Sequence, residues 1–161
     1  MDVLGTYEGP LVRYAFRILG DLEAARDMVQ DCFLSLCRQR QADVEDHVAE
    51  WLFAVCRNRA LDLRRKKPMA TFDTTDLVSR VPGPTADLER REERTEMNGR
   101  IGALPERDQE LLRLKFQEGL SYKQISTVTD LSVSNVGFIL HKALRRLRSE
   151  LTTENATRRQ A

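Results

Sequence analysis

The amino-acid sequence predicts an all-α protein: two small helical domains joined by a flexible linker, with a helix-turn-helix in the C-terminal domain. Three observations support this prediction. Apolar residues recur at spacings of three and four positions along most of the chain, which is the period of an amphipathic helix. Residues that commonly cap helices stand at the ends of these patterns. Charged residues make up 32% and aromatic residues 6% of the 161-residue chain, a composition typical of charge-rich helical modules.

The first 67 residues predict a bundle of three helices joined by short loops. Gly20 is a natural C-terminal cap for the first helix, because glycine readily adopts the left-handed conformation found there. Asp21 and Asp46 can accept hydrogen bonds from the free amides at the start of the second and third helices. The expected helices span residues 7–19, 22–38 and 46–67, with a polar loop at residues 39–45.

The composition changes at residues 68–84, where three prolines and one glycine interrupt any helical period. This segment is predicted to be a flexible linker. A C-terminal helical domain follows at residues 85–151, in which Ser121 and Ser132 can cap the last two helices. The polar tail, residues 152–161, is expected to be disordered. The expected helices of this domain begin at residues 85, 105, 121 and 132.

Net charge identifies no partner by itself. The formal charge of the whole chain is +1. By residue count, the charge is zero over residues 1–67, −3 over residues 68–96 and +4 over residues 97–161. A nucleic-acid or membrane-surface patch therefore has to be sought in local groups of side chains.

The cysteine and apolar patterns narrow the class of protein. Three cysteines without CxxC spacing, together with two histidines, support neither a disulfide framework nor a zinc site. No apolar run approaches the roughly 18 residues of a membrane span, and Arg13 and Arg17 interrupt any signal-peptide pattern. No nucleophile–base pair or phosphate loop is visible. We therefore expect a cytoplasmic protein without membrane insertion, catalytic residues, metal or cofactor.

The last long helix has two different sides when its residues are placed at 100° intervals. Its apolar side can pack on the preceding helices and consists of Val136, Leu140, Ala143 and Leu147. Its opposite side is left free for a partner and consists of Ser134, Phe138, His141 and Arg145, with Gly137 and Lys142 beside them.

That free side admits two interpretations. It can simply meet water, as the polar side of most amphipathic helices does. It can also read DNA, because the second helix of a helix-turn-helix places its early residues at base edges in the major groove. Three features favour DNA reading: the short helix that precedes, Ser134 and Asn135 at the amino end, and Phe138, which suits solvent poorly. Asparagine can pair with adenine and an apolar group can touch a thymine methyl, while the basic residues neutralise phosphates.

The N-terminal helices carry two further candidate surfaces. Asp27, Gln30 and Asp31 share one polar face of the second helix, with Met28 beside them. This face is either a solvated acidic patch or a docking surface for a basic partner, with Met28 giving adaptable apolar contact.

The third helix changes from aromatic to basic along its length. Trp51 stands near its start, and residues 57–67 contain six basic residues against one acid. Aromatic and basic side chains together suit single-stranded nucleic acid, because bases stack while phosphates are neutralised. The alternatives are a core position for Trp51 and a basic end that only complements the helix dipole. Asn58 and Asp62, four positions apart, can form a local polar network.

Three segments, in a fixed order, carry recognisable patterns: ARDMVQDCF at residues 25–33, EWLFAVCRNRALDLRRKK at residues 50–67, and LPERDQELLRLKFQEGLSYKQISTVTDLSVSNV at residues 104–136. They resemble A-E-D-L-V-Q-E-x-F, W-L-x-x-I-A-x-N-x-x-x-D-x-x-R-R, and L-P-x-x-x-R-x-x-x-x-L-x-x-x-x-G-L-S-Y-x-E-I-A. These are motifs of bacterial RNA polymerase sigma factors of the extracytoplasmic-function (ECF) type. The resemblance covers nearly the whole chain.

The resemblance implies two roles for the N-terminal domain, residues 1–67. Its second helix would bind the clamp helices of the polymerase's largest subunit through Asp27, Met28, Gln30 and Asp31. Its third helix would bind the minus-ten element of the promoter through Trp51, Asn58, Asp62, Arg64 and Arg65. The loop at residues 39–45 would hold a flipped base of the melted strand, which helps to drive strand opening.

The resemblance implies that the C-terminal domain reads the minus-thirty-five element. The helices at residues 85–101 and 105–118 would also pack on the polymerase flap, and the acidic linker would thread through the polymerase. An anti-sigma factor is the implied regulatory partner. The implied DNA-binding residues of this domain are Lys115, Tyr122, Lys123, Ser134, Asn135, Gly137, Phe138, His141, Lys142 and Arg145.

The predicted function is therefore a non-enzymatic sigma factor that binds core RNA polymerase, directs it to specific promoters and assists promoter melting. The alternatives are a stand-alone helix-turn-helix regulator that binds duplex DNA and a helical protein-interaction adaptor. The sequence departs from the family pattern at Arg26, where an acid is usual, and at Gln109, close to a frequent arginine. It also has Gly137 and Ile139 where basic residues of the reading helix are common, so we expect its promoter preference to be its own.

Overall fold

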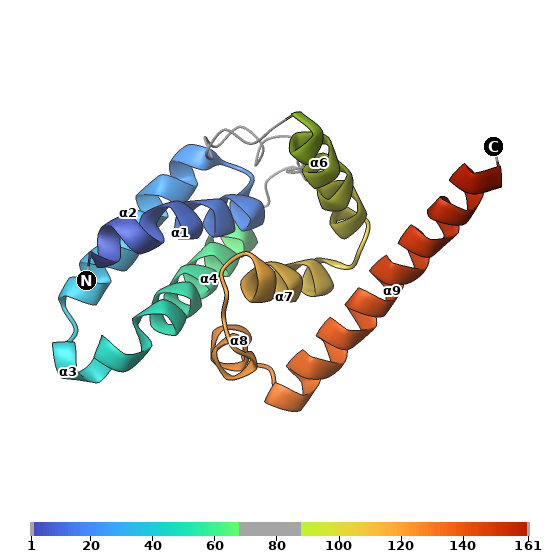
Figure 1. Cartoon of the computed structure of the whole chain (residues 1–161). Helices are drawn as coiled ribbons and strands as arrows, with labels where there is room; N and C mark the ends of the chain where they lie inside the picture. Colours follow the sequence, from blue (N-terminus) through green and yellow to red (C-terminus); the bar gives the residue numbers. More distant parts are fainter. Residues whose placement is uncertain (1, 68–87, 161) are drawn as a thin grey trace. The chain divides into compact units, whose positions relative to one another are not determined.

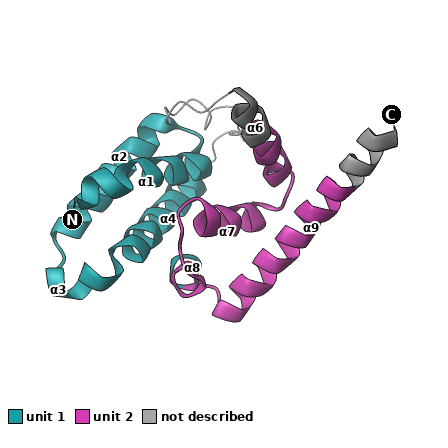
Figure 2. Ribbon diagram, viewed as in Figure 1, with its two compact units in different colours: residues 1–78, 127–130 teal, residues 79–126, 131–161 magenta. Residues whose placement is uncertain are grey.

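The computed structural model describes residues 2–67 and 88–160, with side chains placed for residues 2–67 and 95–152. The chain divides into two compact units, residues 1–78 with 127–130 and residues 79–126 with 131–161 (Figure 2). Every regular element in the described ranges is helical. The all-α prediction is confirmed, whereas the predicted linker at residues 68–84 lies outside the described residues.

Unit 1 is built on three long helices that pack against one another, α1, α2 and α4 (Figure 1). A short helix, α3, and a 3-10 turn, η1, connect α2 to α4. The bounds of the elements are α1 Val3–Leu19, α2 Leu22–Cys37, α3 Gln41–Val44, η1 Glu45–His47 and α4 Val48–Lys66.

Local caps set the ends of α1 and α2. The carboxylate of Asp2 accepts a hydrogen bond from the Gly5 amide at 3.0 Å, so α1 begins four residues earlier than predicted. Gly20 ends α1 with φ 71°, in the left-handed region that glycine tolerates best. Asp21 then accepts from the Ala24 amide at 3.1 Å and starts α2. The predicted roles of Gly20 and Asp21 are confirmed.

The connection between α2 and α4 differs from the predicted loop. Residues within 39–45 form α3, and η1 follows directly. Asp46 lies inside η1, and His47, which precedes α4, makes no side-chain capping bond. The prediction that Asp46 caps the third helix is therefore wrong. Val44 is buried and anchors this connection, while residues 39–43 stay exposed.

The core of unit 1 joins all three long helices. Leu11, Val29 and Leu52 are almost fully buried, one from each helix. The rings of Tyr14 on α1 and Phe53 on α4 meet edge to face, with centroids 5.4 Å apart. This packing fixes which sides of α2 and α4 remain available to partners.

The described residues of unit 2 form α6, α7, α9 and most of α8, and α7 packs against both α6 and α9. Pro105 precedes α7, and Gly119, with φ 70°, follows it. The core is formed by buried leucine, isoleucine and valine side chains, including Leu111, Leu114 and Ile125. The bounds are α6 Leu88–Gly102, α7 Glu106–Phe116, α8 Tyr122–Thr129 and α9 Val133–Gln160.

The C-terminal tail is helical where disorder was expected. Helix α9 has 28 residues and continues to Gln160, so the prediction of a disordered tail at residues 152–161 is wrong over residues 152–160. No glycine or proline occurs after Gly137 in this helix. The sequence therefore lacks the residues that most effectively end a helix.

Candidate nucleic-acid interface

The turn between α8 and α9 has the local structure of a helix-turn-helix. Ser121 and Gln124 form a reciprocal capping box at the start of α8, with bonds of 3.2 and 2.9 Å. Ser132 accepts a hydrogen bond from the Asn135 amide at 3.1 Å and caps α9. In the turn, Asp130 has φ 58°, and the Ser126 hydroxyl donates to the Leu131 carbonyl. Both serine caps predicted from the sequence are confirmed.

The exposed side of α9 agrees with the predicted reading face. Phe138 is 67% exposed, the most exposed of the large apolar side chains in the described ranges. A phenylalanine in this position gains little from water, whereas it can contact a thymine methyl or an apolar partner. The other exposed candidates on α9 are Ser134, Asn135, His141, Lys142 and Arg145.

The buried side of α9 holds the helix on its unit. Val136, Leu140 and Ala143 are each at most 1% exposed, and Leu147 is 7% exposed, as predicted. Ile139 is also buried, at 8%. Ile139 therefore does not stand at an exposed, DNA-facing position. The expectation that it replaces a basic residue of the reading helix is wrong. Gly137 is half-buried and is the remaining departure on this helix.

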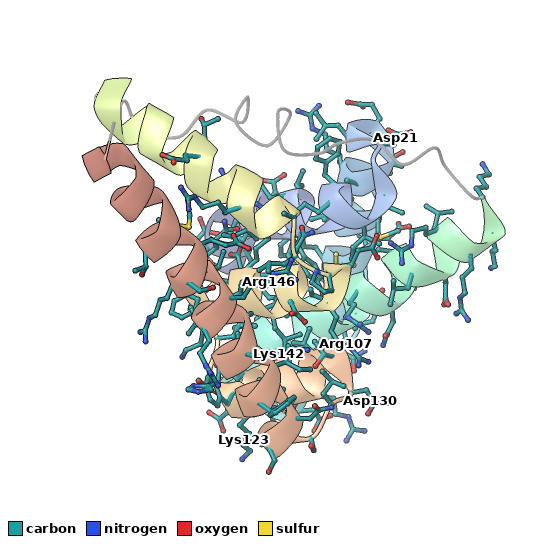
Figure 3. All side chains as sticks on the ribbon, turned by 90° about the vertical axis from the view of Figure 1, so that its right-hand side faces the viewer. Asp21, Arg107, Lys123, Asp130, Lys142 and Arg146 are labelled. Atoms are coloured by element: carbon teal, nitrogen blue, oxygen red, sulfur yellow. The ribbon has the colours of Figure 1, made fainter. Side chains whose placement is uncertain are left out.

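Basic side chains follow one another along α9 beyond Phe138. Figure 3 shows Lys142 and Arg146 along the helix, with Lys123 of α8 near its amino-terminal end. Lys123, Lys142 and Arg146 are exposed. Arg146 makes an ion pair with Glu150 at 3.4 Å, but no acidic residue occurs on α9 before Glu150. Lys142 and Arg145 therefore have no acidic residue within four positions on the same helix, whereas Arg146 is paired with Glu150.

Tyr122 lies beside two other predicted DNA-binding residues of unit 2, Lys115 and Gly137. The Lys115 ammonium lies 5.4 Å from the centre of the Tyr122 ring, and it donates to the Leu120 carbonyl at 3.3 Å. A Cβ placed on Gly137 would lie 3.5 Å from Cε2 of Tyr122. The Tyr122 ring therefore lies beside both Lys115 of α7 and Gly137 of α9.

All five residues predicted to bind the minus-ten element lie on α4, and four of them line one hollow. Asn58, Asp62, Arg64 and Arg65 line an open hollow of about 610 Å³, together with Leu61. Arg65 pairs with Asp62 on the surface, an exposed pair that adds little stability.

Trp51 lies outside this hollow and is half-buried. Counting 100° per residue, it shares a face with Asn58, two turns further along α4. Phe53, in contrast, is 1% exposed, so the two aromatic residues do divide between surface and core. The half-buried position leaves part of the Trp51 ring accessible to a base.

Part of the basic run on α4 has a structural role. The Arg59 guanidinium donates to the Ser35 hydroxyl of α2 at 2.6 Å, and that hydroxyl in turn donates to the Asp31 carbonyl at 2.9 Å. This connection ties α4 to α2 beside the acidic face. The exposed cations of the run are Arg64, Arg65, Lys66 and Lys67.

The acidic face of α2 is confirmed as exposed, with one correction. Asp27, Gln30 and Asp31 are exposed, but Met28 is only 8% exposed and belongs to the core. The prediction that Met28 offers apolar contact on this surface is wrong for this structure. Leu34 is 57% exposed and was missed. Its spacing, four after Gln30 and three after Asp31, is the signal that places it on this face.

The buried thiols fill the core and form no metal site. Cys56 of α4 donates a hydrogen bond to Cys32 of α2, which lowers the pKa of the Cys32 thiol. The same bond and burial together raise the pKa of Cys56. Cys37 is exposed, and all three cysteines are free. Within residues 2–67 and 88–160, no group of three or more histidine, cysteine or acidic side chains could hold a metal ion.

Two family models match separate stretches of this chain. The model described as "Sigma-70 region 2" matches residues 4–68, and the one described as "Sigma-70, region 4" matches residues 96–147. The first match covers α2, α4 and all but the first residue of α1, and the second covers α7, α8 and the first half of α9. Across the described part of the chain, no helix is both long and apolar enough to span a membrane.

Curated relatives match most of the chain. The ECF RNA polymerase sigma factor SigM of Bacillus subtilis is 26% identical over 153 residues, covering 92% of each protein. The ECF RNA polymerase sigma factor SigW of the same organism is 22% identical and covers 93% of this chain and 87% of the relative. The probable ECF RNA polymerase sigma factor SigI of Mycobacterium tuberculosis is 33% identical, over 85% of this chain and 50% of the relative. Together with both region matches, these relatives show that the chain belongs to the ECF group of sigma-70 family sigma factors.

Proposed function

We propose that unit 1 binds core RNA polymerase and the melted minus-ten element, while unit 2 reads the minus-thirty-five element as a duplex. As an ECF sigma factor, the chain directs RNA polymerase to promoters. The observation that carries the proposal is the exposed side of α9, where polar, aromatic and basic side chains project from a capped and well-packed helix.

The polymerase contact on unit 1 is formed by the exposed face of α2. Asp27, Gln30 and Asp31 supply charge and hydrogen-bond acceptors, and Leu34 supplies the apolar contact that Met28 does not. Three negative or acceptor groups around one leucine suit a basic helix with an apolar centre. The clamp helices of the largest polymerase subunit are the proposed partner.

The minus-ten contact is formed by α4 and the connection before it. The hollow lined by Asn58, Asp62, Arg64 and Arg65 offers hydrogen-bonding and cationic groups to a single strand. Trp51 supplies a ring on which a base can stack. The exposed residues 39–43 precede the anchored Val44 and are the proposed site for a flipped base.

The minus-thirty-five contact divides between base edges and phosphates. Asn135 and Phe138 lie early on α9, where a reading helix meets base edges. Lys142 and Arg145 lie further along, where they can neutralise phosphates. Lys123 is exposed at the amino-terminal side of the same surface.

Further partners follow from the same assignment. Helices α6 and α7 are proposed to contact the polymerase flap, and an anti-sigma factor is proposed to cover one or both DNA-binding faces. The protein works in the cytoplasm, where polymerase and promoter DNA are found, and it catalyses no reaction of its own.

Run-off transcription tests the proposal. Core polymerase with and without the full chain is presented with a pool of genomic promoter fragments, and transcript starts are mapped. We expect starts at promoters that core polymerase alone ignores. Duplex binding by the chain without any new transcript would overturn the proposal and favour a stand-alone regulator.

A further inference from the structure

We propose that Lys115 and Tyr122 are positioning residues that set the pose of α9, and that the Lys115 ammonium makes no phosphate contact. This inference rests on the proposed function, because it concerns how the minus-thirty-five face is held. It changes the role that sequence resemblance gives to both side chains, which is direct DNA binding.

The Lys115 ammonium is already engaged within the protein. It lies 5.4 Å from the centre of the Tyr122 ring, within the range of a cation–π interaction. It also donates to the Leu120 carbonyl at 3.3 Å. Leu120 is 4% exposed, and its amide donates to the Leu114 carbonyl at 3.0 Å. Lys115, which is half-buried at the end of α7, therefore stabilises the junction between α7 and α8.

The Tyr122 ring links Lys115 of α7 to α9. It is the first residue of α8, and its Cε2 and Cδ2 lie 3.5 and 3.7 Å from where a Gly137 Cβ would be. One edge of the ring thus rests beside α9 while Lys115 lies against the ring itself. Moving this ring would shift the part of α9 that carries Phe138, one residue after Gly137.

Lys142 is a natural contrast to Lys115. It is exposed on the free side of α9, and among the described side chains of unit 2 none engages its ammonium. Each cation that neutralises a phosphate makes the slope of log affinity against log salt concentration more negative by about 0.9. A cation that only holds a ring in place leaves that slope unchanged. Salt dependence therefore separates the two roles.

The experiment measures binding of holoenzyme to a labelled promoter fragment, chosen by mapping transcript starts, at several salt concentrations. For Lys115→Met we expect about two- to five-fold weaker binding, the loss of one exposed cation–π contact, with the wild-type salt slope and a full active fraction. Lys115→Arg should restore affinity, since it keeps a cation over the ring. For Lys142→Ala we expect a slope shallower by about 0.9.

A double variant tests whether Lys115 acts through the ring. Tyr122→Leu removes the ring, so Lys115→Met should weaken binding no further in that background. Tyr122→Phe keeps the ring and should bind like the wild type. If the losses of promoter affinity from the two substitutions multiply in the double variant, or if Lys115→Met changes the salt slope, the inference is overturned.

The controls keep this outcome separate from the proposed function. If Lys142→Ala lowers the slope while Lys115→Met lowers it equally, the inference fails and DNA reading by α9 stands. If the wild-type holoenzyme shows no gain in promoter binding over core polymerase, the proposed function fails and the inference fails with it. Thermal unfolding of each variant confirms that the affinities refer to folded protein.

Discussion

Helices α4 and α9 each have one buried side and one exposed side that is proposed to meet promoter DNA, yet the two exposed sides differ in chemistry. On α4, Asp62 pairs with Arg65 within the candidate surface, and the exposed cations of the helix lie in its last turn. On α9, no acid occurs before Glu150, and an exposed phenylalanine stands among the polar residues.

The difference corresponds to two forms of DNA. A single strand presents unstacked bases, so stacking and hydrogen bonds can do much of the binding and a partly neutralised surface is sufficient. A duplex presents dense phosphates and only the edges of its bases, so unneutralised cations and small or apolar side chains at the groove are needed. We expect DNA binding by α4 to depend mainly on the shape and packing of the helix. We expect DNA binding by α9 to depend mainly on the chemistry of its exposed side chains.

The largest test of this contrast compares two phenylalanines. Phe53→Ala removes a ring that is 1% exposed, and we expect the free energy of unfolding of unit 1 to fall by about 3–5 kcal/mol. Phe138→Ala removes a ring that is 67% exposed, and we expect a change below about 0.5 kcal/mol together with altered promoter preference. Urea denaturation followed by fluorescence of Trp51, the single tryptophan, reports on unit 1, and circular dichroism reports on both variants.

Equal destabilisation by the two substitutions would break the contrast. It would mean that Phe138 packs in solution, which would remove it from the reading face. Unchanged promoter preference in a stable Phe138→Ala protein would also remove it, although the packing role of Phe53 would stand.

A second test sharpens the description of unit 1 by comparing two leucines. Leu34 on α2 is 57% exposed and Leu4 on α1 is 53% exposed. We expect Leu34→Ala to weaken binding to core polymerase about tenfold, the typical loss for an apolar side chain near the centre of an interface. Leu4→Ala should bind core polymerase like the wild type. Competition with a labelled wild-type chain for core polymerase measures both, and similar affinities for the two variants would contradict the docking face.

The smallest test concerns two glycines of unit 2. Gly137→Ala adds a methyl that meets only the Tyr122 ring at an ordinary contact distance of 3.5 Å. Because alanine favours helix over glycine, we expect unit 2 to gain about 0.5–1 kcal/mol. We expect promoter binding to weaken because the methyl fills the space beside the Tyr122 ring, on the side of α9 that is proposed to approach DNA. Gly99→Ala is the matched control, since nothing lies within 4 Å of its Cβ position.

Gly99→Ala should give the same stabilisation and leave promoter binding unchanged. Thermal unfolding and holoenzyme binding to a promoter fragment measure the two effects separately. If Gly137→Ala stabilises unit 2 and binds promoters as well as the wild type does, close approach at Gly137 plays no part in reading.

Most features fixed by neighbouring residues were predictable from the sequence, and the cap predicted at Asp46 is the exception. Gly20, Asp21, Ser121 and Ser132 all end or begin helices as predicted, because a cap depends on hydrogen bonds within four residues. The two sides of α9 were also predictable, because this helix packs on one side only and its apolar residues repeat at the helical period.

Features fixed by tertiary packing were not predictable in the same way. Helix α2 packs against both α1 and α4, so its buried arc is wider than one apolar stripe and includes Met28 and Cys32. The engagement of Lys115 with Tyr122 depends on how α7 and α8 meet, which no residue pattern within one helix reveals.

The continuity of α9 has a mechanical consequence. A helix of 28 residues is about 42 Å long at 1.5 Å per residue, and the residues of α9 that are proposed to read DNA all lie in its first half. A straight helix acts as a stiff lever, so a small tilt at the groove becomes a much larger displacement at the opposite tip. A spectroscopic label attached at the C-terminal end of α9 would therefore report a small change in the orientation of Phe138 and Lys142 as a larger displacement. A bulky group attached there would hinder the tilt of α9 and so alter DNA binding.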